Sequence, residues 1–510
     1  MNAGSRPQGG AVPRVDWHPR AEPPKGDALP MGAMVGIALL CVAAGVGVAF
    51  GAVSAVMLAA GAIGCMVVLY DFRVGVVMLI LTLPISASDL FPHELFGLTG
   101  LNPMNLLMMG TLVSCAVHVA GDRRLKGIVP AELAWLYVAP LVLAAMLGMR
   151  HVGEIASAFF QMHEVSFYDA GGYLRDLLLK PMFLVLFSLL IAAGVLKTQR
   201  PERLLIPMVV SIWVMCLLVI IYVATANVSL SQLAGVYARQ FLTPLGIHAN
   251  DLGRLYAVAY GLVLFTWAES KDSRLTLPLV ATMGLLVIAL LLTFSRGAFL
   301  GFLIVNGLFV VWRASARTVV GALLIGAALA VLLPGAVLVR VQLGLGSGFD
   351  LDAMTAGRWN NIWLPIFDEL ANSPLWGNGL HSILWAEPMR SGQMFRVTHP
   401  HSAYLEVLLD MGLIGFALLC GYFLKVWKGF RALSRDQALS PELRGFFQGA
   451  AAGLIALAIA NIAGSTLYPA VEQVYLWMAI GVMYGLRLRR PARASTSSPA
   501  FSSAATRHSR

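Results

Sequence analysis

Charge is scarce in this sequence. Asp, Glu, Lys and Arg together make up 12% of the 510 residues, whereas 58% of the residues are hydrophobic and the mean hydropathy is +0.77. A water-soluble domain of this length would carry about twice that fraction of charged residues. Apolar runs of about 20 residues recur along the chain, and this is the length at which a helix crosses a bilayer. We therefore predict an all-α, polytopic membrane helix bundle.

Cysteine and several kinds of motif are scarce too. The five cysteines all lie inside apolar runs, so neither a disulfide framework nor a metal cluster is expected. The polar segments on the predicted outer side contain no aspartate-rich motif, and we expect no metal ion and no cofactor. Residues 1–30 are polar and Pro-rich, and the apolar run that follows lacks a convincing cleavage site, so no cleavable signal is expected. Internal repeats that would indicate an inverted-repeat transporter are not found.

The apolar runs predict about fourteen membrane helices. They are 31–50, 52–70, 74–90, 104–120, 132–149, 177–196, 204–224, 253–269, 275–293, 297–312, 318–338, 403–424, 446–463 and 470–486. An even number of spans places both termini on one side of the membrane. The predicted organisation is a disordered tail (1–30), spans 1 to 11 (31–338), one large loop (339–402), spans 12 to 14 (403–486) and a disordered basic tail (487–510).

The basic residues predict the orientation of these spans. Most of the 36 Lys and Arg residues fall in the segments that share a side with the termini, and each of those segments carries at least one. Because loops rich in Lys and Arg stay on the cytoplasmic side, we predict cytoplasmic termini in a bacterial inner membrane and a periplasmic loop at 339–402. The net charge of +10 then reflects membrane insertion, and no nucleic-acid partner is expected.

Within the large loop, apolar residues recur at steps of three and four between Trp359 and Leu370. This spacing predicts one amphipathic helix. Its two tryptophans, Trp359 and Trp363, suit the headgroup layer of a membrane. Two interpretations stay open: the helix only covers the interface with membrane lipids, or it forms part of a functional site.

Four residues with ionisable side chains are expected at the same outer edge: Arg254, Arg296, Arg358 and His401. A single arginine at the end of a span commonly reaches only to lipid headgroups. Several arginines that face one pocket could instead bind a diphosphate, because forked guanidinium donors match phosphate oxygens. Beside them, a histidine could accept a proton from an attacking hydroxyl near neutral pH.

The residues around His401 have a supporting or a structural interpretation. His399 and His401 flank Pro400, which holds the two imidazoles apart, so a shared metal site is not the first interpretation. Glu406 and Asp410 are four residues apart and therefore lie on one helical face. They could orient the histidine, line the pocket or only bond to neighbouring helices. For Asp410, which lies deeper in its span, we favour the structural role.

The segment HPHSAYLEVLLDMGLIG (399–415) resembles a known motif. His401-Ser402, followed by Gly412 and Gly415, is similar to the histidine motif of the O-antigen ligase and O-antigen polymerase superfamily, with Ser402 where that family commonly has Asn. The elements TFSRGAFLG, GRWNNIW and WGNGL precede it in the order typical of the family. The resemblance covers about residues 250–425.

The resemblance implies a metal-independent, membrane-embedded glycosyltransferase. Its donor would be an undecaprenyl-diphosphate-linked glycan on the periplasmic face, with His401 acting on the acceptor hydroxyl and Arg254, Arg296 and Arg358 holding the diphosphate. His399 and Glu406 would support this site. A ligase of lipopolysaccharide biosynthesis would use a lipid A-core acceptor, whereas an O-antigen or exopolysaccharide polymerase would use a glycan. A flippase for lipid-linked glycans is the more distant alternative, because it needs charges along a cavity that reaches both faces.

Overall fold

The computed structural model describes residues 64–89, 91, 94–95, 98–99, 102–119, 127–161, 165–226, 242–313, 352, 355, 357–464 and 467–489. Residues 68–510 form the unit to which the elements below belong. Several predicted features lie outside the described residues: the spans 31–50 and 318–338, most of the span 52–70, the first part of the loop 339–402 and most of both tails.

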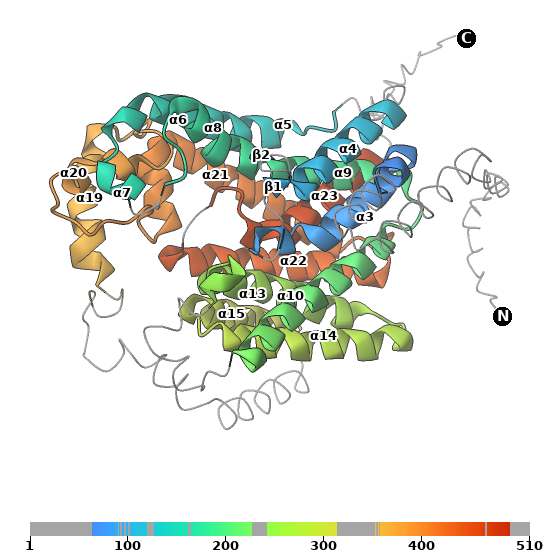
Figure 1. Ribbon diagram of the computed structural model, residues 1–510. Helices are drawn as coiled ribbons and strands as arrows, with labels where there is room; N and C mark the ends of the chain where they lie inside the picture. The colour runs from blue at the N-terminus through green and yellow to red at the C-terminus, as the bar shows by residue number, and fades with distance from the viewer. Residues whose placement is uncertain are drawn as a thin grey trace, which may run out of the picture. The chain divides into compact units, whose positions relative to one another are not determined.

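Helices make up almost all of the described secondary structure (Figure 1). The long helices are α3 (Phe72–Thr82), α4 (Pro103–Val119), α6 (Ala139–Gly148), α9 (Lys180–Lys197), α10 (Leu205–Thr225), α13 (Ala249–Glu269), α14 (Ser273–Leu292), α15 (Arg296–Trp312), α21 (Ala403–Ser434), α22 (Pro441–Ala460) and α23 (Val474–Arg489). The described strands, β1 (Glu94–Leu95) and β2 (Leu98–Thr99), form one short antiparallel pair in which Glu94 pairs with Thr99.

Short helical elements connect or extend the long ones. The α-helical ones are α5 (Ala131–Leu133), α7 (Ser157–Gln161), α8 (Ala170–Leu174), α19 (Leu364–Asn372) and α20 (Glu387–Arg390). The 3₁₀ elements are η1 (Ile85–Ala87), η4 (Met149–Glu154), η6 (Pro201–Leu204), η7 (Thr243–Leu245), η9 (Ser382–Trp385), η10 (Asn461–Ala463) and η11 (Val471–Gln473). The π-helical ones are η3 (Ala134–Val138), η5 (Arg175–Leu179) and η8 (Trp359–Trp363).

Six helical segments of the described chain are long and apolar enough to cross a membrane: Ala131–Glu154, Ala170–Lys197, Pro201–Thr225, Ser273–Leu292, Ala403–Ser434 and Pro441–Ala463. Shorter apolar helices lie at Phe72–Thr82, Pro103–His118 and Arg296–Trp312. The prediction of a helical membrane protein is therefore confirmed. The number of fourteen spans and their orientation stay predictions.

Capping side chains explain where several of these helices begin. Asp71, Asp272, Ser295 and Ser440 precede α3, α14, α15 and α22, and each side chain accepts a hydrogen bond from a backbone N–H of the first turn. An oxygen at this position satisfies a donor that has no partner within the helix. Such residues at the edge of an apolar run therefore set the boundaries of the spans.

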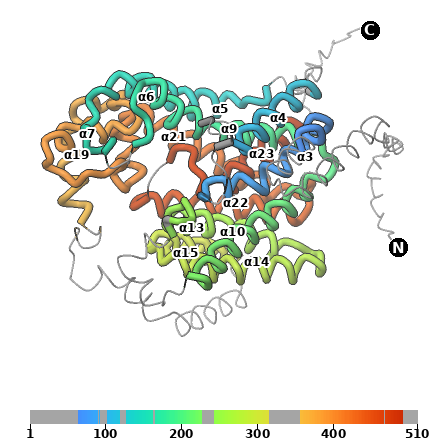
Figure 2. The backbone as a smooth tube through the Cα atoms, in the orientation of Figure 1, coloured from blue at the N-terminus to red at the C-terminus, as the bar shows by residue number. Residues whose placement is uncertain are grey.

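Helix α13 occupies the centre of this arrangement, and it packs against α14, α15 and α22. Its contact with α22 is the most extensive, and Figure 2 shows the two helices side by side. Gly445 and Gly449 of α22 lie against backbone carbonyls of Phe265 and Gly261, so a β-carbon at either glycine would overlap with them. Small residues at a helix interface allow this close backbone approach. Since α13 is enclosed by other helices, it tolerates polar residues that a lipid-facing helix would not.

The short elements α7, α19 and α20 gather at one end of the long helices, on the left in Figure 1. The amphipathic helix predicted between Trp359 and Leu370 is present as η8 continued by α19. Ile362 and Ile366 point into the protein core and are buried. Pro365 falls in the first turn of α19, directly after the π-helical turn η8.

Helix α21 is interrupted at Gly412, which has φ of 62° and ψ of −168°. The backbone groups around this break bond to the loop that precedes η9. These bonds run from Leu413 N to Pro374 O (2.9 Å), Ile414 N to Leu375 O (3.1 Å), Asn378 N to Leu409 O (2.9 Å) and Gly379 N to Asp410 O (2.9 Å). Only glycine combines this positive φ with such a close approach, because a β-carbon at Gly412 would overlap with the Leu375 backbone. The motif glycine therefore joins the broken helix to the loop.

The packing of α13 against α22 predicts opposite effects for two Gly→Ala substitutions. Gly449→Ala should lower the free energy of unfolding by about 1–3 kcal/mol, because the new methyl group overlaps with the Gly261 carbonyl. Gly284→Ala on α14 has open space around it and should raise stability by about 0.5–1 kcal/mol through helix propensity. Denaturant unfolding of the detergent-solubilised protein measures both, and equal effects at the two positions would contradict the close packing.

Candidate functional site

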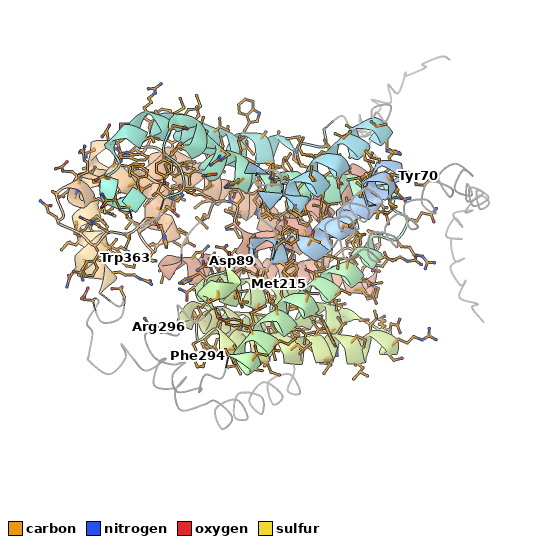
Figure 3. All side chains as sticks on the ribbon, in the orientation of Figure 1. Tyr70, Asp89, Met215, Phe294, Arg296 and Trp363 are labelled. Carbon is orange, nitrogen blue, oxygen red and sulfur yellow. The ribbon has the colours of Figure 1, made fainter. Side chains whose placement is uncertain are left out.

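The segment His399–His401 lies at the start of α21 and is held by an aromatic side chain of the loop helix. The indole Nε1 of Trp363 donates a hydrogen bond of 2.7 Å to the carbonyl oxygen of Pro400. The rings of His399 and His401 lie with their centroids 4.2 Å apart in an edge-to-face arrangement. Figure 3 labels Trp363 in η8, close to the end of the long helices where the short elements gather. The amphipathic helix therefore fixes the backbone between the two histidines.

His401 has a left-handed backbone conformation, with φ of 56°. Residues other than glycine adopt it rarely, and such strained positions cluster at functional sites. The next residue, Ser402, is buried and returns to an extended conformation, and α21 begins directly after it. His401 thus stands at a sharp turn whose far side is anchored by a helix.

Asp410 connects α21 to two other segments. Its Oδ2 accepts hydrogen bonds of 2.8 Å from the backbone N of His381 and from the hydroxyl of Tyr468. Its Oδ1 accepts 3.0 Å and 2.8 Å bonds from the backbone N and the hydroxyl of Ser382. Asp410 is 1% exposed, and its carboxyl group accepts bonds from four donors, which is how a buried polar group is satisfied. These bonds support the structural role that we favoured from its position, and that role stays a prediction.

His381 is placed beside the histidine segment by this carboxylate. Its backbone is also left-handed, with φ of 56°, and its Nδ1 lies 3.4 Å from the carbonyl oxygen of Thr398. His381 was not among the site residues predicted from the sequence. One signal was available, since His381 directly follows the WGNGL element that resembles the family.

His399 lies in a positively charged environment. Burial, together with electrostatic repulsion from His381, Arg254, Arg358 and His248, lowers the pKa of its imidazole to about 4. His248 is the N-cap residue of α13, and Arg254 lies in the second turn of that helix. Residues of three separate segments, namely His381, Arg358 and the start of α13, therefore disfavour protonation of His399. Its imidazole stays neutral near pH 7.

Arg254 is 5% exposed and takes part in a buried network of charges. Its Nη2 donates to Asp251 Oδ1 at 2.6 Å and to Glu472 Oε1 at 3.2 Å. Asp251 is three residues away on the same helix, and this spacing is one at which an ion pair can be predicted from the sequence. Glu472, which lies 218 residues away, could not have been identified without the fold. The two carboxylates hold the guanidinium in one orientation.

The other two predicted arginines, Arg358 and Arg296, lie in η8's N-terminal flank and at the start of α15. The Nη1 of Arg358 donates a 3.4 Å hydrogen bond to the carbonyl oxygen of Ala463, and its charge reaches His399. Arg296 begins α15 (Figure 3), and its neighbour Gly297 shares with Arg254 a narrow gap between α13, α15 and α22. The structure thus brings Arg254 and Arg358 within electrostatic range of His399 and places Arg296 at the start of α15, which packs against the helix that carries Arg254.

Glu406 lies in the first turn of α21 and is 2% exposed. It acts electrostatically on the hydroxyl of Tyr468, the same group that bonds to Asp410. Among the described residues, no group of three or more His, Cys, Asp or Glu is arranged to hold a metal ion.

Residues 281–420 match a family model described as O-antigen ligase. Among curated proteins, no sequence matches the chain. The matched range includes Arg296, Arg358, the histidine segment and the break in α21, whereas Arg254 and Glu472 lie outside it. With its apolar helices, the match indicates a multi-pass bacterial membrane protein that acts on lipid-linked glycans. Residues 281–420 of this chain thus carry a domain of the O-antigen ligase superfamily.

Proposed function

We propose that the protein transfers a glycan from an undecaprenyl-diphosphate carrier to an acceptor hydroxyl on the periplasmic face of the inner membrane. One observation carries the proposal. His401 lies 4.2 Å, ring to ring, from an imidazole that Arg254 and Arg358 act upon electrostatically. A proton acceptor and fixed positive charges are the two components that this transfer requires.

The proposed reaction is a displacement at the anomeric carbon of the donor glycan. The acceptor hydroxyl oxygen forms a bond to that carbon, and the bond between the carbon and the diphosphate oxygen breaks. The electron pair of the broken bond leaves with undecaprenyl diphosphate, and the hydroxyl proton passes to the imidazole of His401. This step is common to ligation onto lipid A-core and to polymerisation onto a growing glycan.

The arginines support the proposal because the leaving diphosphate accumulates negative charge. Arg358 and Arg296 would bind phosphate oxygens through their forked donors, and together with Arg254 they supply charge without a divalent metal ion. The Asp251 and Glu472 carboxylates fix the Arg254 guanidinium, so its charge does not need to reorganise during the reaction. Because Arg254 is already paired twice, we assign it a positioning and electrostatic role and give Arg358 the direct contact.

His399 and Glu406 take supporting roles in this proposal. A neutral His399 avoids a second positive charge beside His401 when that imidazole receives the proton. Glu406 lies in the first turn of α21, where a carboxylate also favours the helix N-terminus. Both would keep the His401 imidazole oriented towards the acceptor.

The proposed base predicts a large effect of one substitution. His401→Ala should lower the rate of glycan transfer by about 10²–10⁴-fold, the usual contribution of a general base. His399→Ala should have a milder effect. His118→Ala, on α4 away from the histidine segment, serves as the matched control. Transfer of labelled undecaprenyl-diphosphate glycan in membranes, with protein levels determined by blotting, measures all three, and full activity of a well-expressed His401→Ala would remove this role.

The environment of His399 predicts how its imidazole titrates. Its protonated form is disfavoured by burial and by nearby positive charge, so its pKa lies at about 4 and below the usual 6.5. As the pH falls from 7 to 5.5, we expect His399 to stay neutral, and to take up a proton only near pH 4. ¹⁵N NMR of histidine-labelled protein in nanodiscs measures this, with His399→Gln to assign the signal. A midpoint at or above 6.5 would contradict the positive environment.

A further inference from the structure

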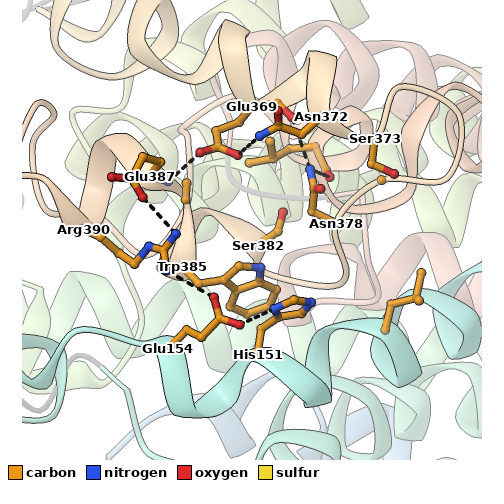
Figure 4. Close-up of a pocket in the computed structure, with 14 residues that line it drawn as sticks. His151, Glu154, Glu369, Asn372, Ser373, Asn378, Ser382, Trp385, Glu387 and Arg390 are labelled. Carbon is orange, nitrogen blue, oxygen red and sulfur yellow. Dashed lines mark hydrogen bonds and ion pairs between the residues drawn. The ribbon is translucent and has the colours of Figure 1, made fainter.

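A pocket of about 280 Å³ lies beside the loop that connects the break in α21 to η9. Its walls come from η4 on one side and from α19, η9 and α20 on the other (Figure 4). None of its lining residues was predicted from the sequence as a site residue. Its volume is just below the range of about 300–1,000 Å³ that holds drug-sized ligands, so it suits one sugar ring.

Polar side chains of the pocket are fixed by one another. Arg390 donates through Nη2 to Glu387 Oε2 at 2.9 Å and through Nη1 to Glu154 Oε2 at 3.3 Å. A 2.7 Å hydrogen bond joins Glu154 Oε1 to His151 Nδ1. On the opposite wall, Glu369 Oε2 accepts a 2.8 Å bond from Asn372. Figure 4 shows these planar groups arranged around one space. Such preset donors and acceptors are suited to a ligand that carries several hydroxyls.

The charges of the pocket exclude the diphosphate part of the donor. Glu154, Glu369 and Glu387 contribute three carboxylates, whereas Arg390 contributes one guanidinium. An anionic ligand would meet net repulsion there, while neutral hydroxyls could donate to the carboxylates and accept from the guanidinium. The indole of Trp385 also lines the pocket and stacks on His151 at 5.4 Å between ring centroids. Polar groups next to an aromatic wall match a sugar ring, which has hydroxyl edges and apolar faces.

The pocket shares a wall with the histidine site. Ser382 lines it, and the backbone N and hydroxyl of this residue bond to Asp410 Oδ1. The other oxygen of Asp410 accepts a hydrogen bond from the backbone N–H of His381. The imidazole of His381 lies beside the carbonyl oxygen of Thr398, next to the histidine segment. A glycan that reacts at His401 could therefore place a neighbouring sugar in this pocket.

We propose that this pocket binds one uncharged sugar ring of the glycan that the protein transfers or extends. The inference rests on the proposed function and specifies the substrate recognised next to that site. Arg390 and Glu387 are the binding residues, because both line the pocket and remain solvent-accessible.

The test is direct binding of a soluble saccharide to the full-length protein in nanodiscs. The probe is the oligosaccharide that mild acid releases from the lipid-linked glycan of cells that make this protein. Saturation-transfer NMR and titration calorimetry compare the wild type with Arg390→Ala and Glu387→Gln. Arg396→Ala is the matched control, an exposed arginine of the same loop that does not line the pocket. Unfolding temperatures show that each variant is folded.

We expect the wild type and Arg396→Ala to bind equally, and the two pocket variants to bind at least about tenfold more weakly. Unchanged binding by both folded pocket variants, or binding of Ca²⁺ in place of the saccharide, would overturn the proposal. His401→Ala should keep saccharide binding although it loses transfer. Transfer by His401→Ala would contradict the proposed base alone, so the two proposals fail separately.

Discussion

The four hydrogen bonds to the Asp410 carboxylate are the interaction on which the arrangement of the site depends. They join the middle of α21 to the backbone of His381 and Ser382 and to the hydroxyl of Tyr468. A buried carboxylate without such donors would cost several kcal/mol, so the loop and the helix stabilise each other. His381 lies next to the histidine segment, and Ser382 lines the polar pocket.

The break in α21 at Gly412 makes this connection possible. An uninterrupted helix would use its own backbone groups, whereas here Leu413 and Ile414 donate to the loop that precedes η9. Irregular backbone within an apolar environment is tolerated only where protein covers it, and Gly412 is buried. The glycine of the histidine motif thus has a physical role that is separate from chemistry. It lets a loop approach the helix closely enough for Asp410 to orient the site.

Much of the fold was predictable from local patterns. The apolar runs from 132 onwards match the helices of the described chain closely, because burial in lipid requires about 20 apolar residues in sequence. The loop helix around Ile362 and Ile366 followed from its spacing. The histidine motif pointed to the segment at the start of α21, and the family match includes it.

The partners of these residues could not be predicted, since they are distant in the sequence. Arg254 pairs with Glu472 across 218 positions, and Tyr468 reaches Asp410 across 58. Neither Glu472 nor Tyr468 is marked by a motif or a charge pattern in its own segment. The pocket around Arg390 combines Glu154 with α19 and α20. In the sequence, its polar residues look like ordinary residues of a solvent-exposed loop. Hydrophobic periodicity reports which face is buried and carries no information on which polar groups meet.

We propose above that Arg358, whose charge acts on His399, contacts the diphosphate of a polyprenyl donor. The most direct measurement is ³¹P–¹⁵N dipolar recoupling in solid-state NMR, on nanodisc-embedded protein labelled at arginine and histidine and loaded with undecaprenyl diphosphate. Arg358→Lys identifies the guanidinium signal, and Arg396→Lys is the control. The account predicts phosphorus within direct contact of an arginine signal that Arg358→Lys removes, together with a change in the His399 resonance. Phosphorus contacts that persist in Arg358→Lys, with no change at His399, would contradict it.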